Sequence, residues 1–441
     1  MPLPQSSPMS VPGPPSVPPA VRRRRRRSWL RSLSLLLLLP CGAAAGIFGV
    51  LWWQERPLRQ AEALLLSGTP TGPAQALKIV DAWLRSNGDS GSGQALKARI
   101  LVRLGDPDQA LRILQQVGAD EVTEMLAWTE ACLLLERWTS ALPVLEHLAK
   151  LQPQNADVLH QLSACRAKLG RYDDAVNAAR RFAALPECEA RGQTLIGMLE
   201  RDRANYQKCV EAWDQLFRIQ PDATGLQISP AEIFLEYGKA LLQLGRNDEA
   251  VPVLQKSASL QQTADAAAFL GKALAGSGRP AEAESAWKTA VQLNPESRIA
   301  REGLAELSLQ NARFTDALQW LTPLENSPSL RSSTAFLLQR TYALLKQPEK
   351  SSAWKERITQ LKREEDARIQ MEQVIFTSPD SLWAQVFQAW HLAEQQNPEQ
   401  AKTVLFPFVR DDSHPFIKKL WTALEQGSAI PGLNEVPMDV Y

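Results

Sequence analysis

One small residue recurs along most of this 441-residue chain at a nearly constant interval. The recurring residues are Ala76, Ala110, Ala141, Ala175, Cys209, Ala250, Ala283, Ala317, Ser351 and Ala401. Five of the nine successive intervals are 34 residues long. A fixed period of this length is typical of stacked supersecondary units, each of which buries its apolar face only against its neighbours. The period therefore predicts a solenoid and not a single compact core.

The stretch 264–295 is the most regular unit. Two stretches of helical periodicity meet there near Gly278, which can turn the chain, and Pro280, which suits the first turn of the helix that follows. Small residues mark the places where two antiparallel helices can approach closely. In this unit they are Gly271, Ala283 and Ala290. Each unit is therefore predicted to be a helix hairpin.

This unit resembles a tetratricopeptide repeat, which carries small residues at its eighth, twentieth and twenty-seventh positions and proline at its thirty-second. The matching residues are Gly271, Ala283, Ala290 and Pro295. The resemblance implies an all-α fold, a right-handed superhelical solenoid of about ten helix-turn-helix repeats over residues 54–428. The small residues expected to pack where helices cross are Gly197, Cys209, Gly238, Ala250, Gly271, Ala283, Ala290 and Ala317.

Two intervals are longer than the period. The interval from Cys209 to Ala250 contains turn-forming residues between Asp222 and Pro230, which predict an inserted loop. The later interval contains a charged stretch without Gly or Pro, which predicts a long helix near 352–376. Such a helix either projects beyond the stack or covers one of its faces. Residues 429–441 lack periodicity and are expected to form a flexible tail.

The resemblance also implies a concave groove lined by the first helix of each unit. The candidate groove residues are Leu195, Met198, Leu235, Lys239, Phe269, Lys272, Phe336 and Arg340. As a surface they would form a docking track for an amphipathic helix or an extended segment of another protein. The alternative is that they pack against neighbouring first helices. No unit carries the Lys, Asn and Arg set with which the family's carboxylate-binding members hold a C-terminus.

The N-terminal region indicates a membrane. Residues 1–28 are rich in Pro and Arg and predict a disordered cytoplasmic tail. The apolar stretch that follows predicts a transmembrane signal-anchor helix over residues 29–53. Arginines precede this span, so the repeats are expected on the extracytoplasmic side of a bacterial inner membrane, with the protein crossing once. The anchoring residues are Arg22, Arg27, Trp29, Pro40, Trp52 and Trp53.

Other interpretations of the same segment stay open. A signal peptide could be cleaved after Ala45, a lipid could be attached at Cys41, and Arg26 begins a sequence that resembles a twin-arginine export signal. All three also place the repeats outside the cytoplasm. Gly42 and Gly46 form a small-residue pattern that would let two spans approach closely, which is the basis for expecting a homodimer.

Charge and reactive residues narrow the function. The net charge of +1 combines +8 over residues 1–59, from nine Arg and one Glu, with −7 over the remainder, from 40 basic and 47 acidic residues. A mildly acidic solenoid is poorly suited to nucleic acid. The five Cys and four His show no spacing typical of metal, redox or hydrolytic sites. We therefore expect no cofactor, no nucleic-acid partner and no enzyme activity.

These features predict a membrane-anchored scaffold that mediates protein–protein interactions on the extracytoplasmic side of a bacterial membrane. One alternative is an accessory subunit of a cell-envelope assembly or secretion machine. Another is a cell-wall glycan-binding protein, suggested by 13 Trp, although Trp213, Trp287 and Trp320 fall at core positions of the repeat.

Overall fold

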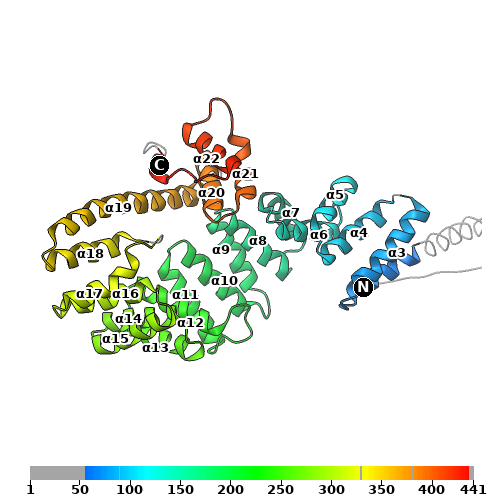
Figure 1. Ribbon diagram of the computed structural model, residues 1–441. Coiled ribbons are helices and arrows are strands. Elements are labelled where there is room, and N and C mark those ends of the chain that lie inside the picture. Colours follow the sequence, from blue (N-terminus) through cyan, green and yellow to red (C-terminus); the bar gives the residue numbers. More distant parts are fainter. Residues whose placement is uncertain (1–54, 89, 328–329, 379–380, 437–441) are drawn as a thin grey trace, which may run out of the picture. The chain divides into compact units, whose positions relative to one another are not determined.

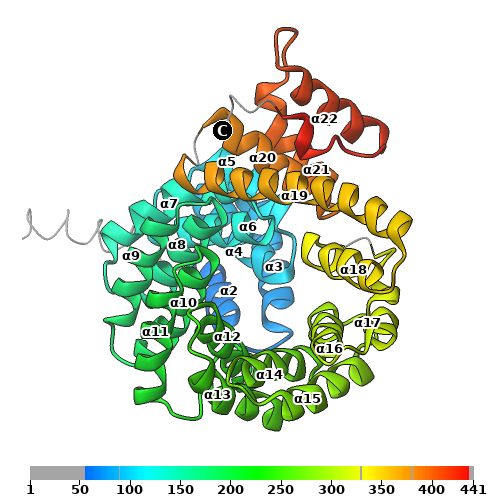
Figure 2. The same cartoon turned by 90° about the vertical axis from the view of Figure 1, so that its left-hand side faces the viewer.

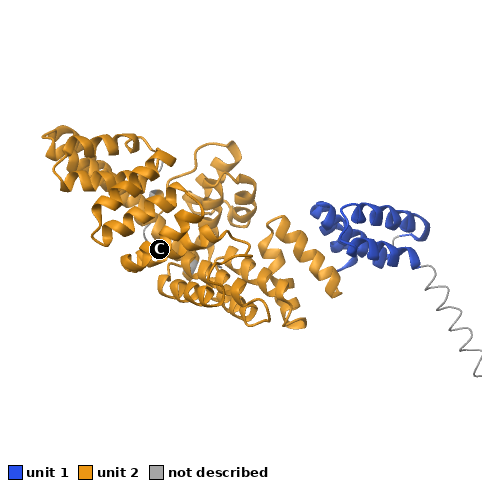
Figure 3. Ribbon diagram, turned by 90° about the horizontal axis from the view of Figure 1, so that it is seen from below, with its two compact units in different colours: residues 1–118 blue, residues 119–441 orange. Residues whose placement is uncertain are grey.

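The computed structural model describes residues 55–88, 90–327, 330–378 and 381–436. Every regular element within these ranges is a helix, which confirms the all-α repeat fold predicted from the 34-residue period. The chain divides into two compact units, unit 1 up to Gly118 and unit 2 from Ala119 onward (Figure 3).

Unit 1 contains two helix hairpins. Their helices are α2 (Arg56–Leu66), α3 (Gly72–Asn87), α4 (Gly91–Leu104) and α5 (Pro107–Val117). The core between the first three helices consists of Leu58, Ala61, Ala76, Val80, Leu84, Leu96 and Ile100. Ala76, the first of the periodic small residues, is fully buried in it.

Unit 2 continues the hairpins from α6 to α18 (Figure 1). Its helices are α6 (Val122–Leu134), α7 (Trp138–Leu151), α8 (Ala156–Lys168), α9 (Tyr172–Ala183), α10 (Glu189–Asp202), α11 (Tyr206–Ile219), α12 (Pro230–Gln243), α13 (Asn247–Leu260), α14 (Ala264–Gly276), α15 (Pro280–Leu293), α16 (Arg298–Gln310), α17 (Phe314–Leu321) and α18 (Ser332–Leu344). The first helices of the hairpins α10–α11 to α16–α17 form the inner layer of an arc, and the second helices form its outer layer (Figure 2).

The turn inside each hairpin places one residue in the left-handed backbone region. Gly278 occupies this position between α14 and α15 with φ of 72°. The same position also has positive φ where it holds Glu136, Gly170, Ala204, Gly245, Ala312 or Lys346. A side chain there costs about 1–2 kcal/mol. Glycine therefore marks only some of these turns in the sequence.

The crossing of α14 and α15 depends on the missing side chain of Gly271. A Cβ atom added to Gly271 would lie 2.5 Å from the Trp287 indole, and one added to Gly303 on α16 would lie 2.4 Å from the same ring. The indole N–H donates to the carbonyl oxygen of Ala268 at 3.1 Å. Trp287 thus fills a volume that two glycines leave open.

The same matching of large and small residues recurs at other crossings. A Cβ on Gly197 would lie 2.7 Å from Trp213, and a Cβ on Gly238 would lie 2.5 Å from Leu254. The corresponding positions of three other hairpins hold buried Ala and Leu: Ala98 and Leu114, Ala305 and Leu321, Ala389 and Leu405. The eight small residues expected at crossings, from Gly197 to Ala317, are all buried.

The C-terminal part of unit 2 departs from this regularity. Its elements are α19 (Pro348–Thr377), α20 (Leu382–Glu394), α21 (Pro398–Leu405), α22 (Pro415–Gln426) and three short 3-10 turns: η1 (Thr322–Leu324), η2 (Phe406–Phe408) and η3 (Leu433–Glu435). Pro323 and Pro407 lie in the turns that follow the eight-residue helices α17 and α21. Proline lacks the amide that would continue an α-helix, so these second helices end early.

The long helix expected near 352–376 is α19, with 30 residues. Its second half leaves α18 and contributes Ala367 and Met371 to a separate core shared with α20, α21 and α22. In unit 2 it carries the chain back across the open side of the arc (Figure 2). The Gln400 side chain on α21 donates to the Glu136 carboxylate at 2.6 Å, although 264 residues separate them.

The expectation of a flexible tail from residue 429 is wrong for its described part. Leu433 and Val436 are buried in the C-terminal core. The Trp390 indole donates to the carbonyl oxygen of Pro431 at 2.8 Å. The segment has no helical period because it packs as an irregular strap, which periodicity cannot detect.

The predicted membrane anchor lies outside the described residues, because the tail 1–28 and residues 29–53, including Arg22, Arg27, Trp29, Pro40, Trp52 and Trp53, all precede residue 55. The same holds for Gly42 and Gly46. From Glu55 to Val436, none of the described helices is both long and apolar enough to span a bilayer.

Candidate protein-binding surface

We use the term inner face for the eight candidate groove residues. They are Leu195 and Met198 on α10, Leu235 and Lys239 on α12, Phe269 and Lys272 on α14, and Phe336 and Arg340 on α18. None of the eight is fully buried. Met198, Leu235 and Phe269 are half-buried against a hydrophobic core shared by α11 to α16, so for them the packing interpretation holds in part. Lys272, Phe336 and Arg340 are exposed, and the Phe336 side chain is 52% accessible.

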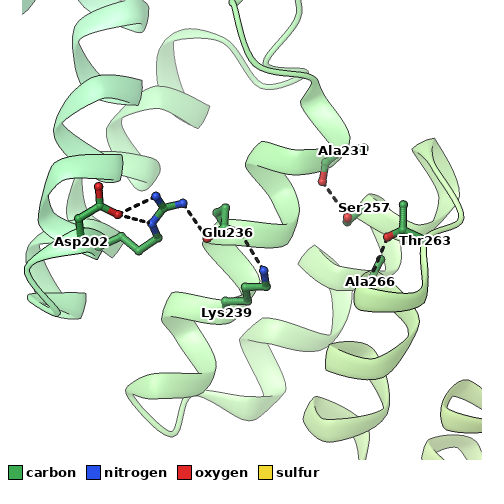
Figure 4. A network of polar contacts seen from close by, with 8 residues as sticks. Asp202, Ala231, Glu236, Lys239, Ser257, Thr263 and Ala266 are labelled. Carbon is green, nitrogen blue, oxygen red and sulfur yellow. Dashed lines mark hydrogen bonds and ion pairs between the residues drawn. The ribbon is translucent and has the colours of Figure 1, made fainter. Parts of the chain in front are cut away.

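A network of contacts involves the first helices of three successive hairpins, and Figure 4 shows its polar part, which joins α10 to α12. Asp202 Oδ1 lies 2.7 Å from Arg201 Nη2, and Arg201 Nη1 lies 3.0 Å from Glu236 Oε2. Lys239 Nζ donates to the other Glu236 oxygen at 2.9 Å. The same ammonium lies 4.8 Å from the Phe269 ring centroid, within the range of a cation–π contact. The network fixes Lys239 and Phe269 relative to each other.

Burial opposes ionisation of Glu236, but Lys239 and Arg201 outweigh it and lower the pKa of this carboxyl below 4.5. Arg201 and Glu236 were not among the predicted site residues. Both lie at repeat positions, the twelfth and the sixth, that the family resemblance assigns to the groove, so the signal was present in the sequence. The candidate groove residues on α10 and α12 were selected mainly for their apolar side chains, so Arg201 and Glu236 were left out.

A second charged row lies at the ninth repeat position of three successive first helices. Lys272, Glu306 and Arg340 occupy it at intervals of 34 residues. Partial desolvation raises the pKa of Glu306, and nearby Glu302 raises it further, while Arg340 and Lys272 oppose the shift. Glu302 is itself paired with Arg298 at 2.9 Å. The row thus presents alternating charge on neighbouring helices.

Several cysteines and tryptophans are buried, unlike the residues of the inner face. Burial raises the pKa of the Cys132, Cys165 and Cys209 thiols to about 11, which suppresses thiolate chemistry. Trp213 and Trp287 are buried, so neither ring is available to stack on a sugar. Within the described ranges, no group of three or more His, Cys, Asp or Glu side chains could hold a metal ion.

The repeat pattern is matched by family models. Three models described as tetratricopeptide repeat match residues 231–263, 270–329 and 382–405. A fourth, described as the N-terminal TPR repeats region of psidin, matches residues 73–184. The chain carries tetratricopeptide repeats. This confirms the resemblance carried by Gly271, Ala283, Ala290 and Pro295, and proteins built from tetratricopeptide repeats generally bind other proteins.

Several solved structures are similar to this tetratricopeptide-repeat chain. MamA from Desulfovibrio magneticus RS-1 shares 20% identity over 38% of this chain and 92% of its own, with a TM-score of 0.35. The pilF protein of Pseudomonas aeruginosa shares 16% identity over 53% of this chain and 96% of its own, with a TM-score of 0.38. The C-terminal part of a TPR repeat-containing protein from Cytophaga hutchinsonii shares 13% identity over 56% of this chain and 99% of its own, with a TM-score of 0.46. No curated protein matches the sequence significantly.

Proposed function

We propose that this chain is a membrane-anchored tetratricopeptide-repeat scaffold that binds segments of other proteins on the inner face of unit 2. The observation that carries the proposal is the exposure of Lys272, Phe336 and Arg340 at repeated positions of the first helices. The α14–α15 crossing beneath Lys272 is already filled by the buried Trp287 ring. Large apolar side chains that remain exposed beside such a core are characteristic of interaction surfaces.

The composition of the inner face supports one class of partner. Apolar side chains alternate with charged ones along successive first helices, which suits an amphipathic helix or an extended segment. The row of Lys272, Glu306 and Arg340 complements a segment that carries one basic group with one acidic group on each side of it.

The binding claim can be tested by site-specific photocrosslinking in cells. A benzophenone amino acid would replace Phe336 on the inner face or, as a matched control, Lys288 on the outer helix α15, which is also exposed. We expect adducts from position 336 that disappear when Lys272→Glu is added, and none from position 288. Equal adducts from both positions, or adducts insensitive to Lys272→Glu, would show that the inner face is not the binding surface.

The anchor proposal rests on the sequence of residues 29–53 and its flanking arginines. We propose a single-pass protein of a bacterial inner membrane with the repeats on the extracytoplasmic side. The full-length protein should resist extraction by alkaline carbonate and dissolve in detergent. A reporter that functions only outside the cytoplasm should be active when it is fused after Pro57. Activity of a cytoplasm-only reporter at that point would reverse the orientation.

A further inference from the structure

An open hollow of about 560 Å³ lies on unit 2 where α11, α12 and α13 meet. This volume falls within the range of ordinary ligand sites. None of the residues that line it belongs to the inner face, so the hollow is separate from the proposed binding surface.

The hollow coincides with the inserted loop between Cys209 and Ala250. Ten residues, 220–229, connect α11 to α12, whereas three, 261–263, connect α13 to α14. The residues at the junction change as well. Phe217 and Phe234 lie where the next junction holds Ala258 and Ala267. The short connection closes over small residues, and the long one leaves aromatic side chains beside an opening.

The floor of the hollow is aromatic. The rings of Phe217 and Phe234 stack with their centroids 4.7 Å apart and an interplanar angle of 17°. The ring of Tyr237 lies 5.3 Å from that of Phe217 at an angle of 38°. Val253 contributes a further apolar wall. Aromatic rings arranged in this way favour stacking or edge contacts with another ring.

The charges at the rim are unequally satisfied. The Tyr237 hydroxyl donates to the Asp214 carboxylate, and Arg246 holds Glu249 through two bonds of 2.7 and 2.6 Å. Both acidic groups of the rim therefore already have a donor. Arg218 is exposed, and among the described residues no hydrogen bond or ion pair engages its guanidinium. The lining carries two acidic and two basic side chains, and Arg218 is the one available to an incoming carboxylate.

We propose that the hollow binds an acidic peptide segment that inserts an aromatic side chain against Phe217 and Tyr237 and places a carboxylate on Arg218. The opening toward solvent lets a side chain enter from a chain that lies along the surface. This site recognises its partner independently of the inner face, because the two share no residue.

The test uses a blocked peptide, acetyl-Ser-Glu-Phe-Glu-Ser-amide, titrated calorimetrically into the full-length protein in detergent at low salt. Blocking both ends leaves only side chains to be recognised. We expect saturable binding that weakens about tenfold with Arg218→Gln, as for loss of a charge-assisted hydrogen bond. Lys150→Gln, which neutralises the equivalent position of α7, should leave the affinity unchanged. Replacing the peptide Phe by Ser, or both Glu by Gln, should abolish binding.

Three results would overturn the proposal. Absence of binding at millimolar peptide would show that the hollow is not a recognition site. Equal affinity of the Arg218→Gln and unaltered proteins, or of the Phe and Ser peptides, would remove its chemical basis. Binding of free 3-phenylpropionate as tightly as the peptide, again dependent on Arg218, would make a small carboxylate the occupant. Since Arg218 is exposed, its variant is expected to fold, and an unchanged melting temperature would verify this.

Discussion

The hairpins α14–α15 and α18–α19 occupy equivalent places in the repeat but are held together differently. In the first, Trp287 fills the space above Gly271. In the second, the corresponding positions hold Lys355 and Gln339, and the Gln339 side-chain amide donates to Ser351 Oγ at 3.0 Å. One crossing is closed by matched apolar volumes, and the other includes a polar bridge.

Gly197, Gly238 and Gly271 on first helices each lie against a bulky residue of the second helix, which is the size matching that the α18–α19 crossing lacks. Helix α19 is instead held along its course. Glu365 accepts bonds from the Ser332 amide at 2.9 Å and hydroxyl at 2.6 Å, at the start of α18, and Met371 enters the C-terminal core.

The largest contrast should come from the two tryptophans of these second helices. Trp287→Ala removes a buried ring between two glycines and should lower the free energy of unfolding by about 3–5 kcal/mol. Trp354→Ala, at a half-exposed position of α19, should lower the free energy of unfolding by clearly less. Denaturant unfolding of both variants, followed by circular dichroism, gives the comparison. Equal losses would mean that the α14–α15 crossing is not special.

Adding one methyl group at the crossing should be costly as well. Gly271→Ala places a Cβ 2.5 Å from the Trp287 ring and should lower the free energy of unfolding by about 1–3 kcal/mol. Gly91→Ala is the matched control, because no atom lies within 4 Å of its added Cβ, and no loss of stability is expected. The result to watch for against this view is a similar melting temperature for the two variants.

The hairpin turns provide a smaller and reciprocal test. Gly278 and Ala312 occupy the same left-handed position, with φ of 72° and 55°. Gly278→Ala should lower stability by about 1 kcal/mol, and Ala312→Gly should raise it, because only glycine adopts this conformation without strain. If both substitutions changed the melting temperature in the same direction, the turns would not be limited by backbone strain.

The effect of Glu236 should depend on pH. Its pKa is lowered in the folded protein, so its charged form stabilises the fold well above pH 4.5, and this contribution is lost as the pH falls through the folded pKa. The difference in stability between the unaltered protein and Glu236→Gln should therefore shrink on acidification. A difference that stays constant from pH 7 to pH 3 would remove Glu236 from the network.

Much of this architecture could be predicted because the crossing residues repeat in phase. The turns were harder to predict, since Ala204, Ala312 and Lys346 adopt a left-handed conformation that is recognisable in a sequence only where the residue is glycine. The segment ending at Val436 was missed because irregular packing has no period. Arg201 and Glu236 lie at repeat positions assigned to the groove, but the sequence does not show that α10 and α12 bring their charges together. The aromatic hollow follows from a loop length whose consequence appears only in three dimensions.

The most direct test of size matching is a double-mutant cycle at the α14–α15 crossing. Buried Ala and Leu occupy these two positions in three other hairpins, so Gly271→Ala combined with Trp287→Leu recreates a pairing that the chain already uses. The free energy of unfolding should show that the penalty of Gly271→Ala nearly disappears in the Trp287→Leu background. Penalties that simply add would contradict the claim that matched volumes at the crossings build this solenoid.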